Sequence, residues 1–447
     1  MLCLCEPSFP EGETCNGRDD DCDGIADNGA SCHLPGEVCT NGACGCPEER
    51  RCQEWCADLD NDTTNCGACG NVCPLGADCV GGSCACPEAE EVCGGRCVDT
   101  DSDAANCGGC GNACAVNEQC TAGVCGCGGD LCGGVCTDRN TDPENCGACG
   151  RSCLGGACAA GVCKPKVLVS NVTTHGPLIV DGPDLYYSTW KEIRRIGKDG
   201  AGGSKLLVDS GELEEYPTAA TFALDQNYIF WSSRYSGTVR SYRSGGGSVQ
   251  MSTEGGGVAT DGQHLFFMRR GALTNRPFSR IDREGTNLLR LLEGSRYNSI
   301  GAGPLAILLD ETHAYVAFPR WIVRVPKEGG EPEDIATDLN IYGAAMAATE
   351  KSLYLSVPGG IMSVPKAGGA PWTVTECEGA YGAIAIEGGD LFYICGQDLY
   401  TKPLNGGPAR ALVRSLDNRT QGFKSGLAVD STAIYFSEQN RILRLAR

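Results

Sequence analysis

The chain has 447 residues, of which 33 are cysteine and 64 are glycine, and its formal net charge at pH 7 is −21. The charge lies in residues 1–163, where 27 acidic side chains face six arginines and no lysine, and such a surface repels nucleic acid and anionic membranes. The sequence has no run of about 20 apolar residues, so we expect no transmembrane segment.

Cysteine spacing organises this acidic half of the chain. Three consecutive repeats of eight cysteines occupy residues 46–85, 86–126 and 127–163. An even number per repeat indicates units that close their own disulfides, and it disfavours zinc or iron–sulfur binding by the CxxC pairs. Disulfides at this density persist only in oxidising compartments. We therefore expect a secreted or cell-surface protein with a loop-rich, disulfide-stapled repeat region, although no signal peptide is visible. The 105 possible pairings per repeat leave the connectivity open.

Residues 1–45 form a separate acidic segment with seven cysteines, an odd count that a lipid anchor on one cysteine would explain. The string CNGRDDDCDGIADNG places acidic residues at the first, third, fifth and ninth positions of a cation loop, with glycine at the sixth, where a sharp turn is needed. The position where a bidentate glutamate would close an EF-hand holds Ala30. The sequence therefore predicts a free-standing metal loop with the ligand candidates Asp19, Asp21, Ile25, Asp23 and Asp27.

This string resembles the metal-binding motif of bacterial secreted and surface proteins, including the MopE-type copper protein. The motif covers about 15 residues and leaves the ion open. Because carboxylate oxygens are hard ligands, we expect calcium in preference to copper or zinc.

A weaker acidic pattern recurs between the third and fourth cysteine of each repeat. Either further cation sites or turns capped by their own side chains would explain it. The residues are Asp58, Asp60, Asp62, Asp99, Asp101, Asp103, Asp138, Asn140 and Asp142. The strings NCGACGNVC, NCGGCGNAC and NCGACGRSC that follow resemble stigma-specific-protein-like cysteine-rich modules, and this resemblance implies secretion.

Residues 165–447 form a second repeat system with a period of about 41 residues, which is the length of a four-stranded propeller blade. Seven apolar strand cores, LYYS, IFWS, LFFM, AYVA, LYLS, LFYI and IYFS, each follow a turn and precede a partner strand, and most of these partner strands end near Gly-Gly. They resemble degenerate YWTD-type propeller repeats. The seventh repeat lacks its last strand, and PKVLVSN at 165–171 matches the missing text. We therefore predict an all-β chain with a closed, seven-bladed β-propeller.

Two features of the predicted propeller point to one of its ends. Cys377 and Cys395 fall at strand ends on the same side, so they are a candidate disulfide, with two buried thiols as the alternative. Loops on that side carry the residue types that anchor interfaces. The candidates for partner binding are Trp190, Arg234, Tyr235, Arg269, Arg270, Arg320 and Trp321.

No catalytic motif is present, so we expect a binding protein and not an enzyme. The favoured hypothesis is a disulfide-stapled, calcium-binding stalk that presents a propeller to an extracellular protein or glycan. The alternatives are a calcium-dependent, lactonase-like propeller hydrolase, whose site would need an exception to the repeat pattern, and a purely structural surface-layer protein.

Overall fold

The structure is a computed structural model, and it describes residues 12–21, 23–174, 176–189, 191–209, 221–233, 237–245, 247–252, 257–268, 278–293, 306–341, 345–377, 383–414 and 426–447. The chain forms two compact units, which divide between Arg139 and Asn140. The third cysteine repeat is split by this division, so its last hairpin belongs to the second unit. Among the described residues, no helix is long and apolar enough to cross a membrane.

The cysteine-rich region consists of two-stranded antiparallel hairpins joined by turns, and the one helix among its described residues is the short 3-10 helix η1 (Glu48–Arg50). The hairpins are β1 (Val38–Thr40) with β2 (Ala43–Gly45), β3 (Arg51–Cys52) with β4 (Trp55–Cys56), β5 (Asp78–Val80) with β6 (Ser83–Ala85), β7 (Glu90–Cys93) with β8 (Arg96–Asp99), β9 (Gln119–Thr121) with β10 (Val124–Gly126), β11 (Asp130–Cys132) with β12 (Val135–Thr137), and β13 (Cys158–Ala159) with β14 (Val162–Cys163).

One disulfide pattern serves repeats 1 and 2, and the three bonds described in repeat 3 follow it. The first cysteine pairs with the third, the second with the fifth, the fourth with the seventh and the sixth with the eighth. In order, the bonds are Cys46–Cys56, Cys52–Cys69, Cys66–Cys79 and Cys73–Cys84 in repeat 1, and Cys86–Cys97, Cys93–Cys110, Cys107–Cys120 and Cys114–Cys125 in repeat 2. Repeat 3 has Cys127–Cys136, Cys146–Cys158 and Cys153–Cys163, and its Cys132 and Cys149 are also disulfide-bonded. These bonds replace an apolar core, which so glycine-rich a region cannot form.

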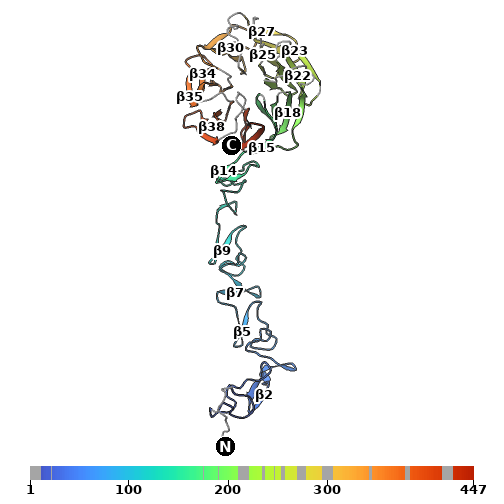
Figure 1. The fold of residues 1–447 in the computed structure, drawn as a ribbon, viewed down its shortest axis with the longest axis vertical. Helices are drawn as coiled ribbons and strands as arrows, with labels where there is room; N and C mark the ends of the chain where they lie inside the picture. The colour runs from blue at the N-terminus through green and yellow to red at the C-terminus, as the bar shows by residue number, and fades with distance from the viewer. Residues whose placement is uncertain are drawn as a thin grey trace. The chain divides into compact units, whose positions relative to one another are not determined.

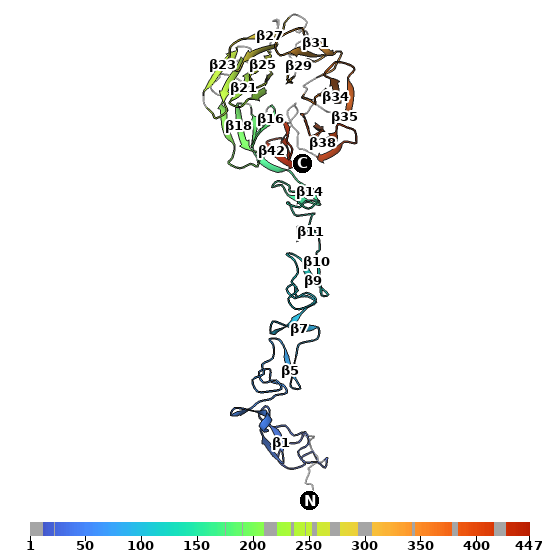
Figure 2. The ribbon, with the colours of Figure 1, turned by 180° about the vertical axis from the view of Figure 1, so that it is seen from behind.

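The described residues of the second unit build seven four-stranded antiparallel sheets, arranged as the blades of a propeller (Figures 1 and 2). From the inner strand outward, the first three blades are β16 (Leu178–Asp181), β17 (Asp184–Ser188), β18 (Glu192–Gly197) and β19 (Lys205–Asp209); β20 (Thr221–Leu224), β21 (Tyr228–Ser233), β22 (Gly237–Tyr242) and β23 (Ser248–Ser252); and β24 (Val258–Thr260), β25 (His264–Met268), β26 (Phe278–Asp282) and β27 (Leu289–Leu292).

The next three blades are β28 (Ala306–Leu309), β29 (His313–Ala317), β30 (Ile322–Pro326) and β31 (Glu333–Ala336); β32 (Met346–Ala348), β33 (Ser352–Val357), β34 (Gly359–Pro365) and β35 (Trp372–Cys377); and β36 (Ile384–Glu387), β37 (Asp390–Cys395), β38 (Asp398–Pro403) and β39 (Arg410–Val413). The seventh blade is β40 (Leu427–Val429), β41 (Ala433–Glu438), β42 (Arg441–Ala446) and β15 (Lys166–Val169).

The seventh blade closes the ring as the sequence predicts. Its fourth strand, β15, comes from the start of the propeller sequence and pairs with β42, so that Lys166 lies opposite Arg444. Figure 1 shows β15 beside the C-terminal end of the chain. Because the first and last repeats share one sheet, separating them would break a full strand pairing.

The core of the ring lies between the blades. The aromatic strand cores fill it because alternate side chains of each second strand face opposite neighbouring blades. Phe230, Phe266 and Phe436 are fully buried, and Tyr186 and Tyr435 are 1% exposed. The end of the third repeat joins this core, since Cys146, Cys153 and Cys163 are buried against residues of blades 6 and 7.

Candidate cation site and propeller face

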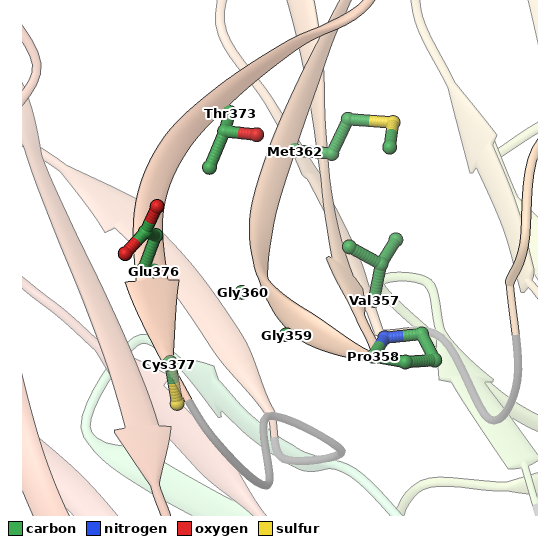
Figure 3. A pocket seen from close by; sticks show the side chains of 8 residues that line it. All are labelled: Val357, Pro358, Gly359, Gly360, Met362, Thr373, Glu376 and Cys377. Atoms are coloured by element: carbon green, nitrogen blue, oxygen red, sulfur yellow. The ribbon is translucent and has the colours of Figure 1, made fainter.

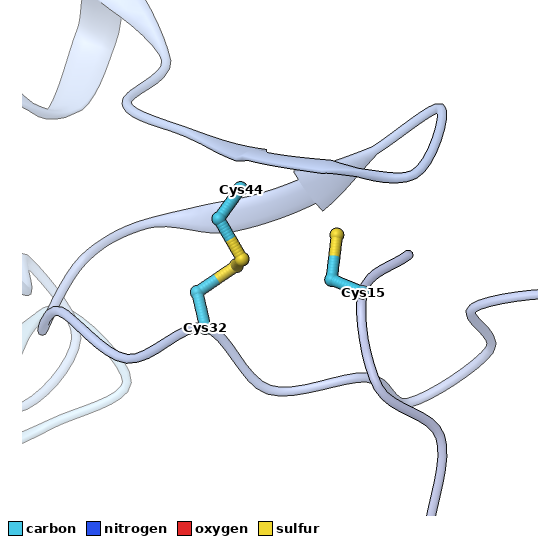
Figure 4. Close-up of side chains that lie close together, drawn as sticks. All are labelled: Cys15, Cys32 and Cys44. Carbon is cyan, nitrogen blue, oxygen red and sulfur yellow. A yellow bond between two sulfur atoms is a disulfide. The ribbon is translucent and has the colours of Figure 1, made fainter. Parts of the chain in front are cut away.

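The acidic segment is framed by two disulfides that lie against each other. Cys15–Cys39 and Cys32–Cys44 repeat the last two bonds of the cysteine repeats. In Figure 4 the sulfur of Cys15 lies beside the Cys32–Cys44 bond, and the sulfur atoms of the three residues lie within 4.8 Å of one another. Since metal binding by cysteine needs the thiolate, these sulfurs are structural crosslinks and the oxygens of the loop are the cation ligands to consider.

Glu13, which lies before the predicted motif, organises the acidic loop. Its side chain is buried, and one carboxylate oxygen accepts the backbone N–H groups of Asp20 and Asp21, both at 2.8 Å. The other oxygen accepts the N–H of Asp27 at 2.7 Å. One buried carboxylate thus fixes both ends of the loop. Sequence reasoning missed this residue because it looked only at the ligand positions.

Three predicted ligands converge on the turn of the loop. Asp19 accepts the N–H groups of Asp23 and Gly24 through its two oxygens, each at 3.0 Å. Asp21 accepts the N–H of Asp23 at 3.1 Å, and Asp23 accepts that of Ile25 at 2.9 Å. Gly24 has a φ of +99°, which glycine adopts at little cost. The loop therefore gathers the carboxylates of its first, third and fifth positions around one turn.

The charges of this turn repel one another. Local desolvation raises the pKa of Asp21 above its usual value, and the negative charges of Asp23 and Glu13 act in the same direction. Asp20, between two predicted ligands, has another role: hydrogen bonds from the Thr14 hydroxyl and the Asn16 amide hold its pKa low. A bound cation would relieve the repulsion at Asp21.

The other two predicted ligands lie differently. One Asp27 oxygen accepts the backbone N–H groups of Asn16 and Gly17 at 2.8 and 2.9 Å, so this carboxylate closes the start of the segment. The Ile25 side chain is exposed, and its carbonyl is the only group that it could offer a hard cation.

Most of the acidic triplets in the cysteine repeats hold their own turns together. Asp62 accepts hydrogen bonds from Thr64 and Asn65, and Asp142 accepts them from Glu144 and Asn145. Mainly because the Asn65 and Asn145 amides donate to them, the pKa values of the Asp62 and Asp142 carboxyls lie below their usual value. In the second repeat Asp99 accepts from Ser102, and Asp103 accepts from Ala105. Asp60 forms an ion pair with Arg50. Asp58 accepts the N–H of Asp60, while Asp138 and Asn140 also have bonding partners.

Five of the predicted partner-binding residues lie outside the described residues: Trp190, Arg234, Tyr235, Arg269 and Arg270. The other two occupy the β29–β30 turn. Arg320 is exposed, and its carbonyl accepts the N–H of Leu339 at 2.9 Å. Trp321 is half-buried, stacks on Phe318 with 5.4 Å between ring centroids, and packs on the core between blades 3 and 4. The indole therefore contributes to packing, and Arg320 is the accessible member of the pair.

Blade 5 carries a depression of about 530 Å³ that the sequence did not indicate. In Figure 3, Val357, Pro358 and Met362 line one side, and Thr373, Glu376 and Cys377 line the other. Cys377 forms a disulfide with Cys395 of blade 6.

Comparisons with known proteins add little to this description. No family model matches the sequence, and no curated protein is significantly similar to it. Solved structures with a similar fold include the extracellular domain of a protein described as a one component system from B. thetaiotaomicron, with 13% identity, a TM-score of 0.48, and coverage of 63% of this chain and 39% of that one.

Two further similar structures have different roles. One is PorZ, a surface component of the type-IX secretion system of Porphyromonas gingivalis, with 8% identity and a TM-score of 0.45 over 62% of this chain and 38% of that one. The other is a gluconolactonase of Xanthomonas campestris, with 12% identity and a TM-score of 0.38 over 63% and 89%. This chain thus spans about two fifths of the first and second of these proteins. At such values the likeness carries no argument about function.

Proposed function

We propose that the chain is an extracellular or cell-surface binding protein whose propeller engages a protein or glycan and whose acidic segment binds calcium. The observation that carries this proposal is the presence, in one chain, of a seven-bladed ring and of repeated disulfide modules. Such modules form and persist where thiols are oxidised. In this proposal the chain is a binder and not an enzyme, so calcium-dependent hydrolysis of a lactone by the purified protein would contradict it.

The binding face in this proposal is the end of the ring that carries the β29–β30 turn. Arg320 supports it because its guanidinium is exposed while backbone hydrogen bonds fix its turn. Arginine in a fixed position is a frequent anchor of interfaces. The test is an array of extracellular proteins and glycans probed with the full chain. Arg320→Ala should weaken the strongest interaction at least about tenfold, and Arg410→Ala, which removes an exposed arginine from an outer strand, should not. Equal effects of the two substitutions would remove this face from the proposal.

The calcium site in this proposal consists of Asp19, Asp21 and Asp23, with the carbonyl of Ile25 and water completing the shell. The donor set fits, because calcium takes six to eight oxygen ligands at about 2.3–2.6 Å and copper or zinc prefers nitrogen or sulfur. Calcium would replace the N–H groups that these carboxylates now accept, and it would offset the repulsion that raises the pKa of Asp21.

Calorimetry of the oxidised full chain tests this site. The triple variant D19N/D21N/D23N should lose one binding event. The control E48Q/E49Q/E54Q removes the same charge from exposed residues of repeat 1 and should keep that event. Identical titration curves for the two variants would show that calcium responds to overall charge and not to the loop.

A further inference from the structure

A recurring contact joins neighbouring blades, and blades 4 and 5 show it most clearly. Arg324, on the third strand of blade 4, donates to the carbonyl of Lys366 in blade 5 at 2.9 Å. Lys366 in turn reaches Asp310, after the first strand of blade 4, at 3.1 Å. We call this arrangement of arginine, lysine and aspartate the inter-blade clamp. It ties two blades in both directions with charged groups that are only 12% exposed at Lys366 and 27% exposed at Asp310.

The clamp recurs around the ring. Two more complete sets are Arg280, Lys327 and Asp261, and Arg444, Lys198 and Asp430. In blades 2 and 3, Arg240 donates to the Arg283 carbonyl, and the Arg283 guanidinium lies 3.9 Å from the Asp225 carboxylate. Blades 1 and 2 keep the ion pair of Arg243 with Asp181, and in blade 7 Arg447 bonds the Glu387 carbonyl and the Asp390 carboxylate of blade 6. We call the boundary between two neighbouring blades a seam, and each of these six seams has a hydrogen bond or ion pair from a charged side chain across it.

The seam between blades 5 and 6 has neutral residues at all three clamp positions. Ser363 lies opposite Tyr354 in the sheet, as Arg324 lies opposite Tyr315. The two other positions are Thr349 and Leu404. Backbone hydrogen bonds establish both equivalences. The N–H of Leu404 donates to the Gly389 carbonyl, as the N–H of Lys366 donates to the Lys351 carbonyl. The N–H of Thr349 donates to the Ser352 carbonyl, as the N–H of Asp310 donates to the His313 carbonyl.

The replacements do not supply a polar link across this seam. The Thr349 hydroxyl donates to the Ser352 carbonyl, and the Ser363 hydroxyl donates to that of Leu353, so both bonds stay inside blade 5. Leu404 packs in an apolar cluster with Tyr354 and Ile361. At its clamp end, this seam depends on apolar contact.

A disulfide crosses the same seam at its other end. Cys377 ends β35 of blade 5, and Cys395 ends β37 of blade 6. Strand β37 begins at the clamp end with Asp390, so the bond lies opposite to the missing clamp. These are the only two cysteines of residues 165–447. The ring thus has one covalent crosslink, at the one seam whose clamp positions are all neutral.

We propose that the Cys377–Cys395 disulfide is a latch that takes the place of the missing clamp, so that the propeller opens first between blades 5 and 6 when this bond is reduced. An external dithiol supplies the two electrons and two protons: the disulfide becomes two thiols, and the dithiol becomes a cyclic disulfide. Cys377 lines the depression of blade 5 and is 5% exposed, so in this proposal a reductant approaches the bond from that side. Closure of the ring thereby depends on an oxidising environment.

Hydrogen exchange of the full chain tests this latch. In the C377S/C395S variant, amides of β35 and β36 should exchange at least about tenfold faster, while those of β30 and β31 keep their rates. Grafting the clamp into that variant with T349D, S363R and L404K should restore slow exchange. As a matched control, Lys366→Met in the wild-type chain should loosen the seam between blades 4 and 5 and leave β36 unchanged.

The proposal would be overturned if amide exchange in C377S/C395S became faster equally in all blades or stayed as in the wild type. It would also be overturned if the folded grafted variant did not regain slow exchange in β35 and β36. If C377S/C395S does not fold, the wild-type chain is titrated with dithiothreitol, and alkylation of Cys377 and Cys395 is mapped beside the exchange. The latch predicts that β35 and β36 loosen at the dithiol concentration that exposes these two thiols. Loosening of all seams at that concentration, or of none, would refute it.

Discussion

Replacing Glu13 should release the acidic loop. The carboxylate accepts three backbone N–H groups in a buried position, and hydrogen bonds to a charged acceptor contribute about 1.5–3 kcal/mol each. Because two of the bonds share one oxygen and the freed amides of Asp20 and Asp21 can reach water, we expect Glu13→Ala to cost about 2–4 kcal/mol locally. Glu13→Gln keeps the shared acceptor and loses the bond to Asp27, so it should cost about half as much.

Amide exchange of the oxidised full chain measures this effect directly. A cost of about 2 kcal/mol corresponds to exchange about 30-fold faster at Asp20, Asp21 and Asp27 in Glu13→Ala. The amides of residues 23–25 bond to other carboxylates and serve as an internal reference. Calcium affinity should fall as well, since the two ends of the loop would no longer be fixed. Unchanged exchange at Asp27, or equal acceleration at residues 23–25, would refute the role assigned to Glu13.

Two further predictions concern the propeller. Burial opposes ionisation of Asp310, but hydrogen bonds from Tyr315 and Lys366 outweigh it and hold the pKa of this carboxyl well below 3.8. Below about pH 4 the folded ring therefore binds fewer protons than the unfolded chain. Stability should therefore fall as the pH drops through this range, and Asp310→Asn should flatten the decline of Tm with acid; parallel acid curves would contradict the clamp. Phe436 is fully buried between blades 6 and 7, so Phe436→Ala should lower the free energy of unfolding by about 3–5 kcal/mol in thermal unfolding. A loss below about 1 kcal/mol would show that the seam between these two blades does not depend on the packing of Phe436.

The propeller could be predicted from the sequence repeats of residues 165–447. Seven similar strand cores predicted the number of blades. The similarity of residues 165–171 to other fourth strands predicted how the ring closes, which is by the pairing of β15 with β42. The reason is physical: every blade buries the same kinds of strand residues, so the amino-acid sequence repeats from blade to blade. The disulfide connectivity was beyond such reasoning, because spacing alone leaves 105 pairings per repeat.

Contacts between distant residues were harder to predict. The clamp residues Arg324, Lys366 and Asp310 occupy recurring positions of the sequence repeats, yet their hydrogen bonds form only when two blades pack against each other. The Trp321 indole looked accessible in a loop, but its stacking on Phe318 depends on the packing of blades 3 and 4. Sequence reasoning gave the ligand types of the acidic loop, and it could not show which carboxylates face the turn.

If the chain acts outside the cytosol as an oxidised protein, the cells that produce it must expose or release it with its disulfides formed. Intact cells are labelled with a membrane-impermeant reagent, free thiols are trapped, and the disulfides of the labelled chain and of the medium are mapped by mass spectrometry. We expect a labelled or released chain with the bonds Cys46–Cys56, Cys52–Cys69, Cys66–Cys79 and Cys73–Cys84 in repeat 1 and the equivalent bonds in the other repeats. A chain protected from the label, with these cysteines trapped as thiols, would contradict it.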